Sequence, residues 1–261
     1  MDMGLKGKVA LVTGGGRGIG QGIVKRLAEA GCDIAVADII EENAKKVADE
    51  VKAMGRRAIA IKVDVSKWDQ VQNMVKETID KLGGLDIAVN NAGVISIMPV
   101  EELTEKDWEF VNDVNAKGVF LCCKAVIPYM KKQKWGPIIN TASIAGKTGF
   151  PSLAHYTASK FAVVGFTNAL AKELAKTGIT VNAICPGIVG TQMWYGPTGL
   201  AEKWKQPGET MDESWKRHQE TLIPQGVAQT SEDMGDLAVY FATSPHVTGQ
   251  AVAVDGGMTV G

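Results

Sequence analysis

The sequence predicts a doubly wound α/β fold built on one parallel sheet. Short apolar runs recur along the 261 residues, and they alternate with longer segments whose apolar residues have helical spacing. Several of the runs are almost uniformly apolar, which is typical of parallel strands that are covered on both faces. The expected strands are 9–13, 34–38, 58–63, 85–90, 137–143, 179–185 and 251–255.

The helical segments between these strands carry recognisable end signals. The first expected helix, 20–30, ends at Gly31, and the second, 40–54, ends at Gly55. Ser66 is expected to cap the third helix, because a serine hydroxyl accepts a hydrogen bond from a free backbone N–H. Right-handed crossovers then place helices on both faces of the sheet. In such sheets, ligands bind beyond the carboxyl ends of the strands.

The composition is that of a globular protein with little net charge. The chain has 28 Lys and Arg residues against 29 Asp and Glu residues, a formal net charge of −1. This balance provides no broad basic field, so we expect no nucleic-acid partner and no membrane partner. There is no apolar stretch of ~20 residues and no signal-peptide core, which predicts a cytoplasmic protein. Four cysteines and three histidines in no ligand pattern predict reduced thiols and no metal.

A single domain is expected to span residues 1–261, because no linker or repeat interrupts the alternation of strands and helices. The segment 190–222 departs from that rhythm. It follows the sixth expected strand, and it is long and rich in tryptophan, glycine and charge. Long insertions at a ligand-binding edge are commonly functional, so we expect this segment to be a substrate lid.

A glycine-rich turn joins the first expected strand to the first helix. Gly14, Gly18 and Gly20 lie in TGGGRGIG (13–20), where backbone N–H groups and the helix N-terminus can hold phosphate oxygens. The spacing is GxxxGxG rather than the usual GxGxxG of dinucleotide-binding folds. A purely structural tight turn is the alternative. The order of strand, glycines and helix favours a pyrophosphate site.

Asp38 is the candidate reader of the cofactor's adenosine ribose. It lies 18 residues after Gly20, at the end of the second expected strand. A carboxylate there accepts hydrogen bonds from both ribose hydroxyls and repels a 2′-phosphate, which predicts NAD rather than NADP. Arg17 is the opposing signal, since a cation in the loop could meet that phosphate. Asp38 could also act as a helix N-cap, a role that does not exclude the first.

Two further strand ends fall on the same edge of the sheet. Asp64 could accept a hydrogen bond from the adenine amino group, with Val65 beside it. Asn91, Ala92 and Gly93 could lay their backbone against the adenosine. Taken alone, each of these segments is also a common turn-former.

A tyrosine, a lysine and a serine form the candidate chemical centre. Tyr156 and Lys160 are four apart in an expected helix, so they share one face. A phenol is a poor base at neutral pH, and a nearby ammonium lowers its pKa. Ser143 ends the fifth expected strand, where its hydroxyl could hold a carbonyl oxygen that gains negative charge. The set suits proton transfer to and from an alcohol.

These motifs together resemble the short-chain dehydrogenase/reductase family, in its shorter form, over nearly the whole chain. The resemblance is carried by TGGGRGIG (13–20), NNAG (90–93), Asn115, Ser143, YTASK (156–160), CPG (185–187) and DGG (255–257). The GxxxGxG spacing is this family's own pattern. The resemblance implies a Rossmann-like domain with a seven-stranded sheet, usually in a homotetramer.

The resemblance also implies roles for individual residues. Tyr156 would be the general acid/base and Ser143 would bind the substrate oxygen. Lys160 would bind the nicotinamide ribose and depress the Tyr156 pKa, and Asn115 would hold a water that relays protons through Lys160. Pro186, Gly187, Ile188 and Thr191 would cover the nicotinamide and its phosphate. The residues expected at the NAD cofactor are Gly14, Arg17, Gly18, Ile19, Gly20, Asp38, Asp64, Val65, Asn91, Ala92, Gly93, Tyr156, Lys160, Pro186, Gly187, Ile188 and Thr191.

The substrate is expected to be a small, partly polar secondary alcohol or its ketone. Its contacts are expected from Ile95, Ser143, Phe150, Tyr156, Gly187, Met193 and Trp194. The stretch CPGIVGTQMW (185–194) resembles the branch that contains acetoin reductases and 2,3-butanediol dehydrogenases, although Gln192 stands where proline is expected. His155 could contact substrate or only start a helix. Trp204 and Trp215 are expected to pack within the lid rather than stack on substrate.

Three alternatives remain open at this stage. A polyol or sugar dehydrogenase shares the same framework. A 3-ketoacyl thioester reductase would use NADPH and present a basic patch to an acyl carrier, which Asp38 and the near-neutral composition disfavour. A non-catalytic NAD-binding regulator would be expected to have lost Ser143, Tyr156 or Lys160, and all three are present.

Overall fold

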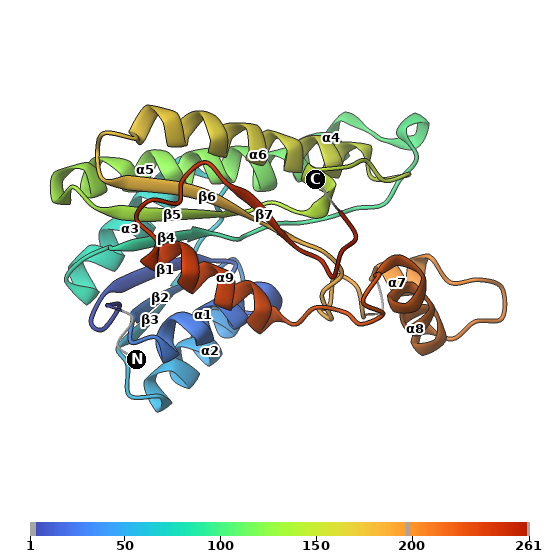
Figure 1. Cartoon of the computed structure of the whole chain (residues 1–261), viewed down its shortest axis with the longest axis horizontal. Helices are drawn as coiled ribbons and strands as arrows, with labels where there is room; N and C mark the ends of the chain where they lie inside the picture. The colour runs from blue at the N-terminus through green and yellow to red at the C-terminus, as the bar shows by residue number, and fades with distance from the viewer. Residues whose placement is uncertain (1–3, 197–198, 260–261) are drawn as a thin grey trace.

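The computed structural model describes residues 4–196 and 199–259. Within these residues, seven parallel strands form one sheet in the order β3-β2-β1-β4-β5-β6-β7 (Figure 1). The strands are β1 (Val9–Thr13), β2 (Asp33–Asp38), β3 (Ala58–Lys62), β4 (Ile87–Asn90), β5 (Gly136–Thr141), β6 (Ile179–Pro186) and β7 (Ala251–Val254). The doubly wound parallel fold predicted from the uniformly apolar runs is confirmed.

Helices cover both faces of this sheet. One face packs against α1 (Gly18–Glu29), α2 (Glu41–Ala53) and α9 (Ser231–Thr243). The other face packs against α3 (Trp68–Leu82), α5 (Gly118–Gln133) and α6 (Ala154–Leu174). The burial of apolar side chains on both faces explains why these strands carry few polar residues. A shorter helix, α4 (Glu105–Asn112), packs against α6.

The register brings the carboxyl ends of neighbouring strands to one edge. Thr13, the last residue of β1, pairs with Ala37 near the end of β2 and with Asn90 at the end of β4. Short helical turns follow at the same edge: η1 (Val100–Glu102), η2 (Asp113–Lys117) and η3 (Ile144–Gly146). The fold therefore gathers the predicted functional segments where ligands bind in parallel sheets.

One local prediction was wrong. The N-cap of α3 is Lys67, and the Ser66 hydroxyl donates to Asp64 Oδ1 at 2.7 Å rather than capping the helix. The Ser66 backbone N–H also donates to Asp64 Oδ1, at 2.9 Å. The Ser66 hydroxyl therefore bonds to the Asp64 carboxylate instead of to a backbone N–H of α3.

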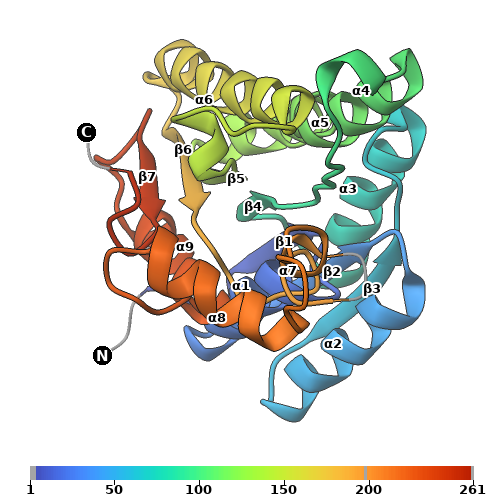
Figure 2. The same cartoon turned by 90° about the vertical axis from the view of Figure 1, so that its right-hand side faces the viewer.

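The segment 190–222, which we call the insertion, connects β6 to α9 and lies beyond the carboxyl ends of the strands (Figures 1 and 2). It contains α7 (Leu200–Lys203) and α8 (Met211–Leu222). Pro197 and Thr198 of this segment lie outside the described residues, as do the ends, 1–3 and 260–261, of the predicted domain. Of the helices in the described part, none is both long and apolar enough to cross a membrane.

Candidate active site

The glycine loop between β1 and α1 is pressed against the end of β4. Gly14 has a φ of +61°, and a Cβ added there would lie 2.9 Å from the Ala92 Cα. The Asn91 amide donates to the Thr13 and Gly14 carbonyls, at 3.1 and 3.2 Å. Only glycine fits this approach, so the structure joins the predicted loop to the predicted 91–93 segment.

Asp38 lies on the same loop from the side of β2. It is 6 % exposed, and its Oδ2 accepts a hydrogen bond of 3.0 Å from the Gly16 backbone N–H. Its Oδ1 accepts one of 3.0 Å from the N–H of Ile40, the residue that caps α2. The carboxylate therefore stands beside the glycine cradle, as a ribose-reading group must. It also orders the start of α2.

Asp64 and Val65 lie at the end of β3. The Asp64 carboxylate accepts two hydrogen bonds from Ser66, which is the turn-forming role left open by the sequence. Val65 is buried and packs on Gly118, where an added Cβ would lie 2.8 Å from its Cγ2. Contact of either residue with adenine stays a prediction.

Tyr156 and Lys160 project from the first turns of α6 toward the end of β5. The Lys160 ammonium donates to the Thr141 carbonyl at 2.9 Å and lies 5.6 Å from the centre of the Tyr156 ring. Ser143 follows β5 and caps η3, with its Oγ accepting from Ala145 N–H at 3.1 Å. The three predicted residues therefore meet at one place on the sheet edge.

Asn115 sits in the π-helical turn η2 between α4 and α5 and is fully buried. Its Oδ1 accepts from Val94 N–H at 2.8 Å, and its Nδ2 donates to Val94 O at 2.9 Å. A Cβ added to Gly93 would lie 3.4 Å from Asn115 Oδ1 and 3.5 Å from Lys160 Nζ. Asn115 and Lys160 are thus neighbours. The predicted water relay between them is untested.

Ser159 is a residue of this network that the sequence reasoning missed. It is fully buried, accepts from Asn115 Nδ2 at 3.1 Å and donates to the Tyr156 carbonyl at 2.6 Å. Ser159 ties the Asn115 turn to the turn of α6 that presents Tyr156. Its position in YTASK, three residues after the tyrosine, is the signal that could have identified it.

Burial is the largest influence on the pKa values of Tyr156 and Lys160. It raises the pKa of Tyr156 to about 12, against a smaller lowering by a hydrogen bond with Ser143. It lowers the pKa of Lys160 to about 8. Burial is the largest influence on the Tyr156 pKa in this structure, and the expected lowering of that pKa by Lys160 stays a prediction.

Tyr156 belongs to an apolar cluster that includes residues from the segments after β4 and β5. Its buried members are Val111, Ala145, Leu153 and Tyr156, and the half-buried residues Val94, Ile95, Ile97, Phe150 and Trp204 pack against them. The predicted substrate contacts Ile95 and Phe150 are thus brought to the tyrosine. Trp204, expected to pack within the insertion rather than stack on substrate, packs on Trp194 and also reaches this cluster.

The other predicted substrate residues of the insertion lie close by. The Trp194 ring packs on Trp204 and Trp215, with ring centres 5.8 and 6.2 Å apart. The Met193 carbonyl accepts from Leu200 N–H at 3.0 Å. Contact of Met193 or Trp194 with a substrate stays a prediction.

The turn after β6 leads from the sheet to the insertion. Gly187 N–H donates to Val254 O at 3.0 Å, and the buried Ile188 accepts from Gln229 N–H at 2.9 Å. Thr191 reaches the glycine loop, since a Cβ added to Gly18 would lie 3.2 Å from its Cγ2. This places Thr191 where it can share a phosphate with the loop, whereas the roles of Pro186, Gly187 and Ile188 are untested.

His155 has a structural partner. It is fully buried, and its Nε2 lies 2.7 Å from the Ser96 hydroxyl in the segment after β4. Burial lowers the pKa of this imidazole. His155 therefore links the start of α6 to the segment after β4. This contact favours a structural role for His155 over direct contact with substrate.

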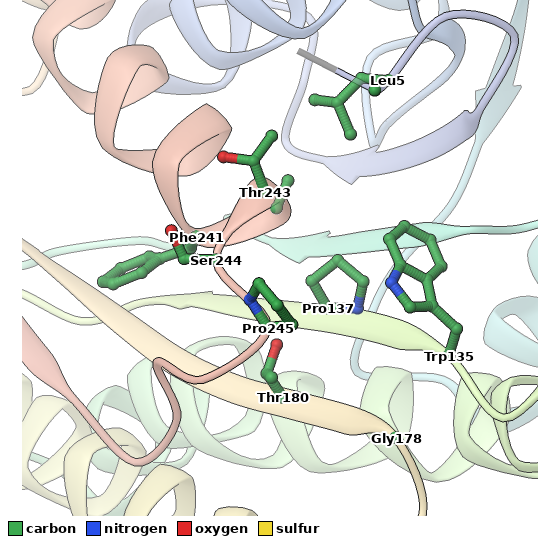
Figure 3. A pocket seen from close by; sticks show the side chains of 11 residues that line it. Leu5, Trp135, Pro137, Gly178, Thr180, Phe241, Thr243, Ser244 and Pro245 are labelled. Carbon is green, nitrogen blue, oxygen red and sulfur yellow. The ribbon is translucent and has the colours of Figure 1, made fainter.

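A cavity of about 210 Å³ opens at the opposite edge of the sheet (Figure 3). Trp135 and Pro137 of the β5 start, Thr180 of β6, and Phe241 and Pro245 at the end of α9 line it. Pro137 and Thr180 lie at the amino ends of β5 and β6, whereas Ser143 follows the carboxyl end of β5. The cavity is therefore separate from the candidate active site.

Comparison with known proteins decides the family. The protein-family model described as short chain dehydrogenase matches residues 8–197 of this chain. The chain belongs to the short-chain dehydrogenase/reductase family. It is accordingly an oxidoreductase that acts on CH–OH groups and uses a nicotinamide cofactor.

Other members of this family align along nearly the whole chain. An L-2,3-butanediol dehydrogenase of Corynebacterium glutamicum is 43 % identical over 256 residues, covering 96 % of this chain and 98 % of the relative. A 3-oxoacyl-[acyl-carrier-protein] reductase of Staphylococcus aureus is 37 % identical over 254 residues, with the same coverage. The crystal structure of a short-chain type dehydrogenase/reductase from Mycobacterium marinum superposes with a TM-score of 0.87 at 36 % identity, covering 98 % of this chain and 96 % of that one.

Proposed function

We propose that this short-chain dehydrogenase/reductase transfers hydride between NAD(H) and a small secondary alcohol or its ketone, with 2,3-butanediol and acetoin as the model pair. The observation that carries the proposal is that Tyr156, Lys160 and Ser143 meet at the carboxyl edge of the sheet, with Tyr156 inside an apolar cluster. The 43 % identity to an L-2,3-butanediol dehydrogenase supports the same substrate class.

The choice of NAD rests on Asp38. Its buried carboxylate lies against Gly16 of the cradle, and a 2′-phosphate beside it would be repelled. Arg17, the cation that could offset this repulsion, instead donates to Gln192 of the insertion at 2.7 Å. The residues present therefore fit a dinucleotide with an unmodified adenosine ribose.

The chain's own groups handle the proton. The Ser143 hydroxyl donates to the substrate oxygen, and in oxidation the Tyr156 phenolate takes the hydroxyl proton. Lys160, held by the Thr141 carbonyl, stabilises that phenolate and exchanges protons near Asn115. A nicotinamide cofactor bound at the glycine loop and Asp38 would supply the hydride acceptor for the carbinol carbon. Reduction of the ketone reverses each step.

The apolar cluster around Tyr156 favours an alcohol with few polar groups. A sugar or polyol would bury several hydroxyls and needs a partner for each. In the cluster, Ile95, Ile97, Phe150 and Leu153 offer none, and the nearby Ser96 and His155 bond to each other. These contacts support a small diol or acyloin over a polyol.

The surface beside the start of α6 disfavours an acyl carrier. A groove of about 420 Å³ runs there between Val100, Trp108 and Ala154, and it is edged by the exposed carboxylates of Glu105 and Glu109. A 3-ketoacyl thioester reductase calls for a basic patch at its entrance. The acidic rim has the opposite sign.

The test is a substrate panel assayed with NAD and NADP side by side. The proposal predicts NADH formation from 2,3-butanediol, NADH consumption by acetoin, and turnover with NADP at least about tenfold lower. Turnover confined to a 3-ketoacyl thioester and NADPH would contradict the proposal. Turnover of sugar alcohols alone would support the polyol alternative.

We also propose that the chain forms a homotetramer. Phe120 of α5 and Phe161 of α6 are large apolar side chains exposed on one helical face, at 44 % and 46 %. Tyr240 of α9 and Val252 of the edge strand β7 are exposed on another side. Exposed apolar side chains on two sides of the molecule suit a closed assembly with two kinds of interface. Light scattering would give the mass of four chains.

A further inference from the structure

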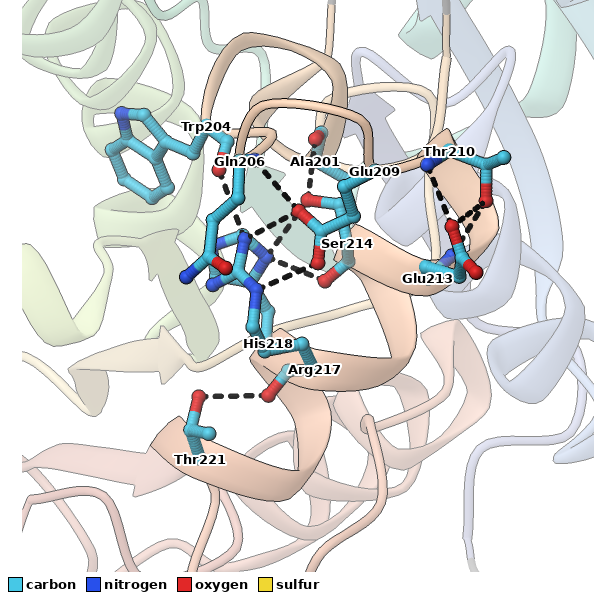
Figure 4. Close-up of polar contacts among 10 residues, drawn as sticks. All are labelled: Ala201, Trp204, Gln206, Glu209, Thr210, Glu213, Ser214, Arg217, His218 and Thr221. Atoms are coloured by element: carbon cyan, nitrogen blue, oxygen red, sulfur yellow. Dashed lines mark hydrogen bonds and ion pairs between the residues drawn. The ribbon is translucent and has the colours of Figure 1, made fainter.

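Trp204 links the insertion to the catalytic tyrosine. It follows α7, and its side chain packs against the apolar cluster that contains Tyr156. Figure 4 shows the indole directed away from the polar network of the insertion. Trp204 is the insertion's one side chain among the described residues of that cluster, whose other members come from the segments 94–97, 111 and 145–156.

The backbone of Trp204 is held by Arg217, which also forms a bidentate salt bridge with Glu209. The Arg217 guanidinium donates to the Trp204 carbonyl at 3.0 Å. The same guanidinium binds both oxygens of Glu209, each at 2.8 Å (Figure 4). Glu209 also accepts from Gln206 N–H at 2.8 Å, which closes the loop after α7. This fork-to-fork geometry fixes where the tryptophan leaves the backbone.

The indole ring is positioned from two sides. Trp194 meets it edge-on, with ring centres 5.8 Å apart, and His218 lies 5.9 Å away. His218 is itself fixed, because its Nδ1 lies 2.7 Å from the Ser214 carbonyl. Ser214 in turn donates to Ala201 O at 2.7 Å. A ring packed in this way resists displacement, so it can act as a rigid wall.

We propose that Trp204 is a specificity-determining residue whose indole limits the length of the alcohol that reaches Tyr156. The proposal rests on the function proposed above and extends it to a substrate class: short secondary alcohols and acyloins, with longer chains rejected by the indole. Because Trp204 belongs to the insertion, it can exclude longer alcohols only while the insertion packs against the Tyr156 cluster, as it does in this structure.

Trp215 provides a matched control. It lies in the same insertion, packs on Trp194 at 6.2 Å and on Tyr195 at 5.9 Å, and does not belong to the described part of the Tyr156 cluster. Replacing Trp215 removes an indole of equal size from the same aromatic group. Only Trp204 should change which alcohols are accepted.

The experiment compares Trp204→Ala, Trp204→Phe and Trp215→Ala over a series of acyloins and 2-alkanols of four to eight carbons. In Trp204→Ala, the ratio of kcat/KM for the longest to the shortest substrate should rise about tenfold or more, with Trp204→Phe intermediate. In Trp215→Ala, the ratio should stay within about twofold of the unmodified protein. Melting temperature and NADH binding check that each variant is folded.

An unchanged ratio in Trp204→Ala, or an equal rise in Trp215→Ala, would overturn the inference. Failure of the proposed function looks different: the unmodified protein would turn over no acyloin or 2-alkanol. In that case, ligand-observed NMR gives the dissociation constants of 2-alkanones for each variant. The affinity for the longest ketone relative to the shortest should rise in Trp204→Ala and stay nearly unchanged in Trp215→Ala.

Discussion

Arg17 of the glycine loop donates a hydrogen bond of 2.7 Å to Gln192 at the start of the insertion, across 175 positions of sequence. Thr191 touches the same loop at Gly18. The loop therefore meets the insertion on one side and Asp38 on the other. The cation that could favour a 2′-phosphate is directed toward the insertion, so under the proposed function we expect the Asp38 carboxylate to set the cofactor preference.

Asp38→Ala should weaken the preference for NAD over NADP. Removal of the carboxylate deletes both the ribose acceptor and the repulsion of a 2′-phosphate, so the NAD/NADP ratio of kcat/KM should fall about tenfold or more. Steady-state kinetics with both cofactors measures it. Glu42→Gln, which neutralises an exposed carboxylate in the first turn of α2, is the control. An unaltered ratio in Asp38→Ala would mean that another group reads the ribose.

Gln192→Ala should release Arg17 and improve NADPH binding relative to NADH by about two- to fivefold, the range of an exposed hydrogen bond to a charged group. Dissociation constants from nicotinamide fluorescence give this ratio. The gain should disappear when Arg17→Ala is added, because the guanidinium causes it. Gln206→Ala, an exposed glutamine of the same insertion, should change neither constant. A gain that survives Arg17→Ala would refute the link.

Lys160 should make stability depend on pH above neutrality. Its pKa is about 8 in the folded protein against an ordinary 10.5, so between these values the unfolded chain binds more protons. Stability of the unmodified protein relative to Lys160→Met should therefore rise from pH 8 to pH 10, by roughly 2 to 3 kcal/mol. Above pH 10 the raised pKa of Tyr156 acts in the opposite direction, because the unfolded tyrosine loses its proton first.

Urea unfolding at pH 7.5 and pH 10 tests this prediction. Lys176→Met, which removes an exposed lysine just beyond α6, is the matched control and should show no such pH-dependent difference. A constant difference between the unmodified protein and Lys160→Met at both pH values would show that Lys160 is not buried as a cation.

The fold and the shared helix face of Tyr156 and Lys160 were predictable from sequence because each depends on local pattern. Uniformly apolar runs specify strands that are buried on both faces, and the spacing of Tyr156 and Lys160 specifies one helix face. The glycines of 13–20 specify a turn that other residues cannot enter. These signals lie within a few residues of one another, so no knowledge of tertiary contacts is needed.

The remaining features depend on contacts that spacing does not encode. Trp204 reaches the Tyr156 cluster because Arg217 and Glu209 hold its backbone, and no periodicity joins these residues. The Ser66 cap failed because a carboxylate two residues earlier competes for its hydroxyl. The pKa of Tyr156 rises because the ring is buried, and burial follows from packing rather than from the position of a lysine.

Tyr156→Phe gives the most direct test of the central claim, since it removes a single phenolic oxygen. NADH formation from 2,3-butanediol, followed by absorbance, should fall at least about a thousandfold, while NADH binding and melting temperature stay close to those of the unmodified protein. Tyr195→Phe, at an exposed tyrosine of the insertion that bonds to Asp212, should keep turnover. Turnover retained in Tyr156→Phe would contradict the assignment of this phenol as the group that moves the proton.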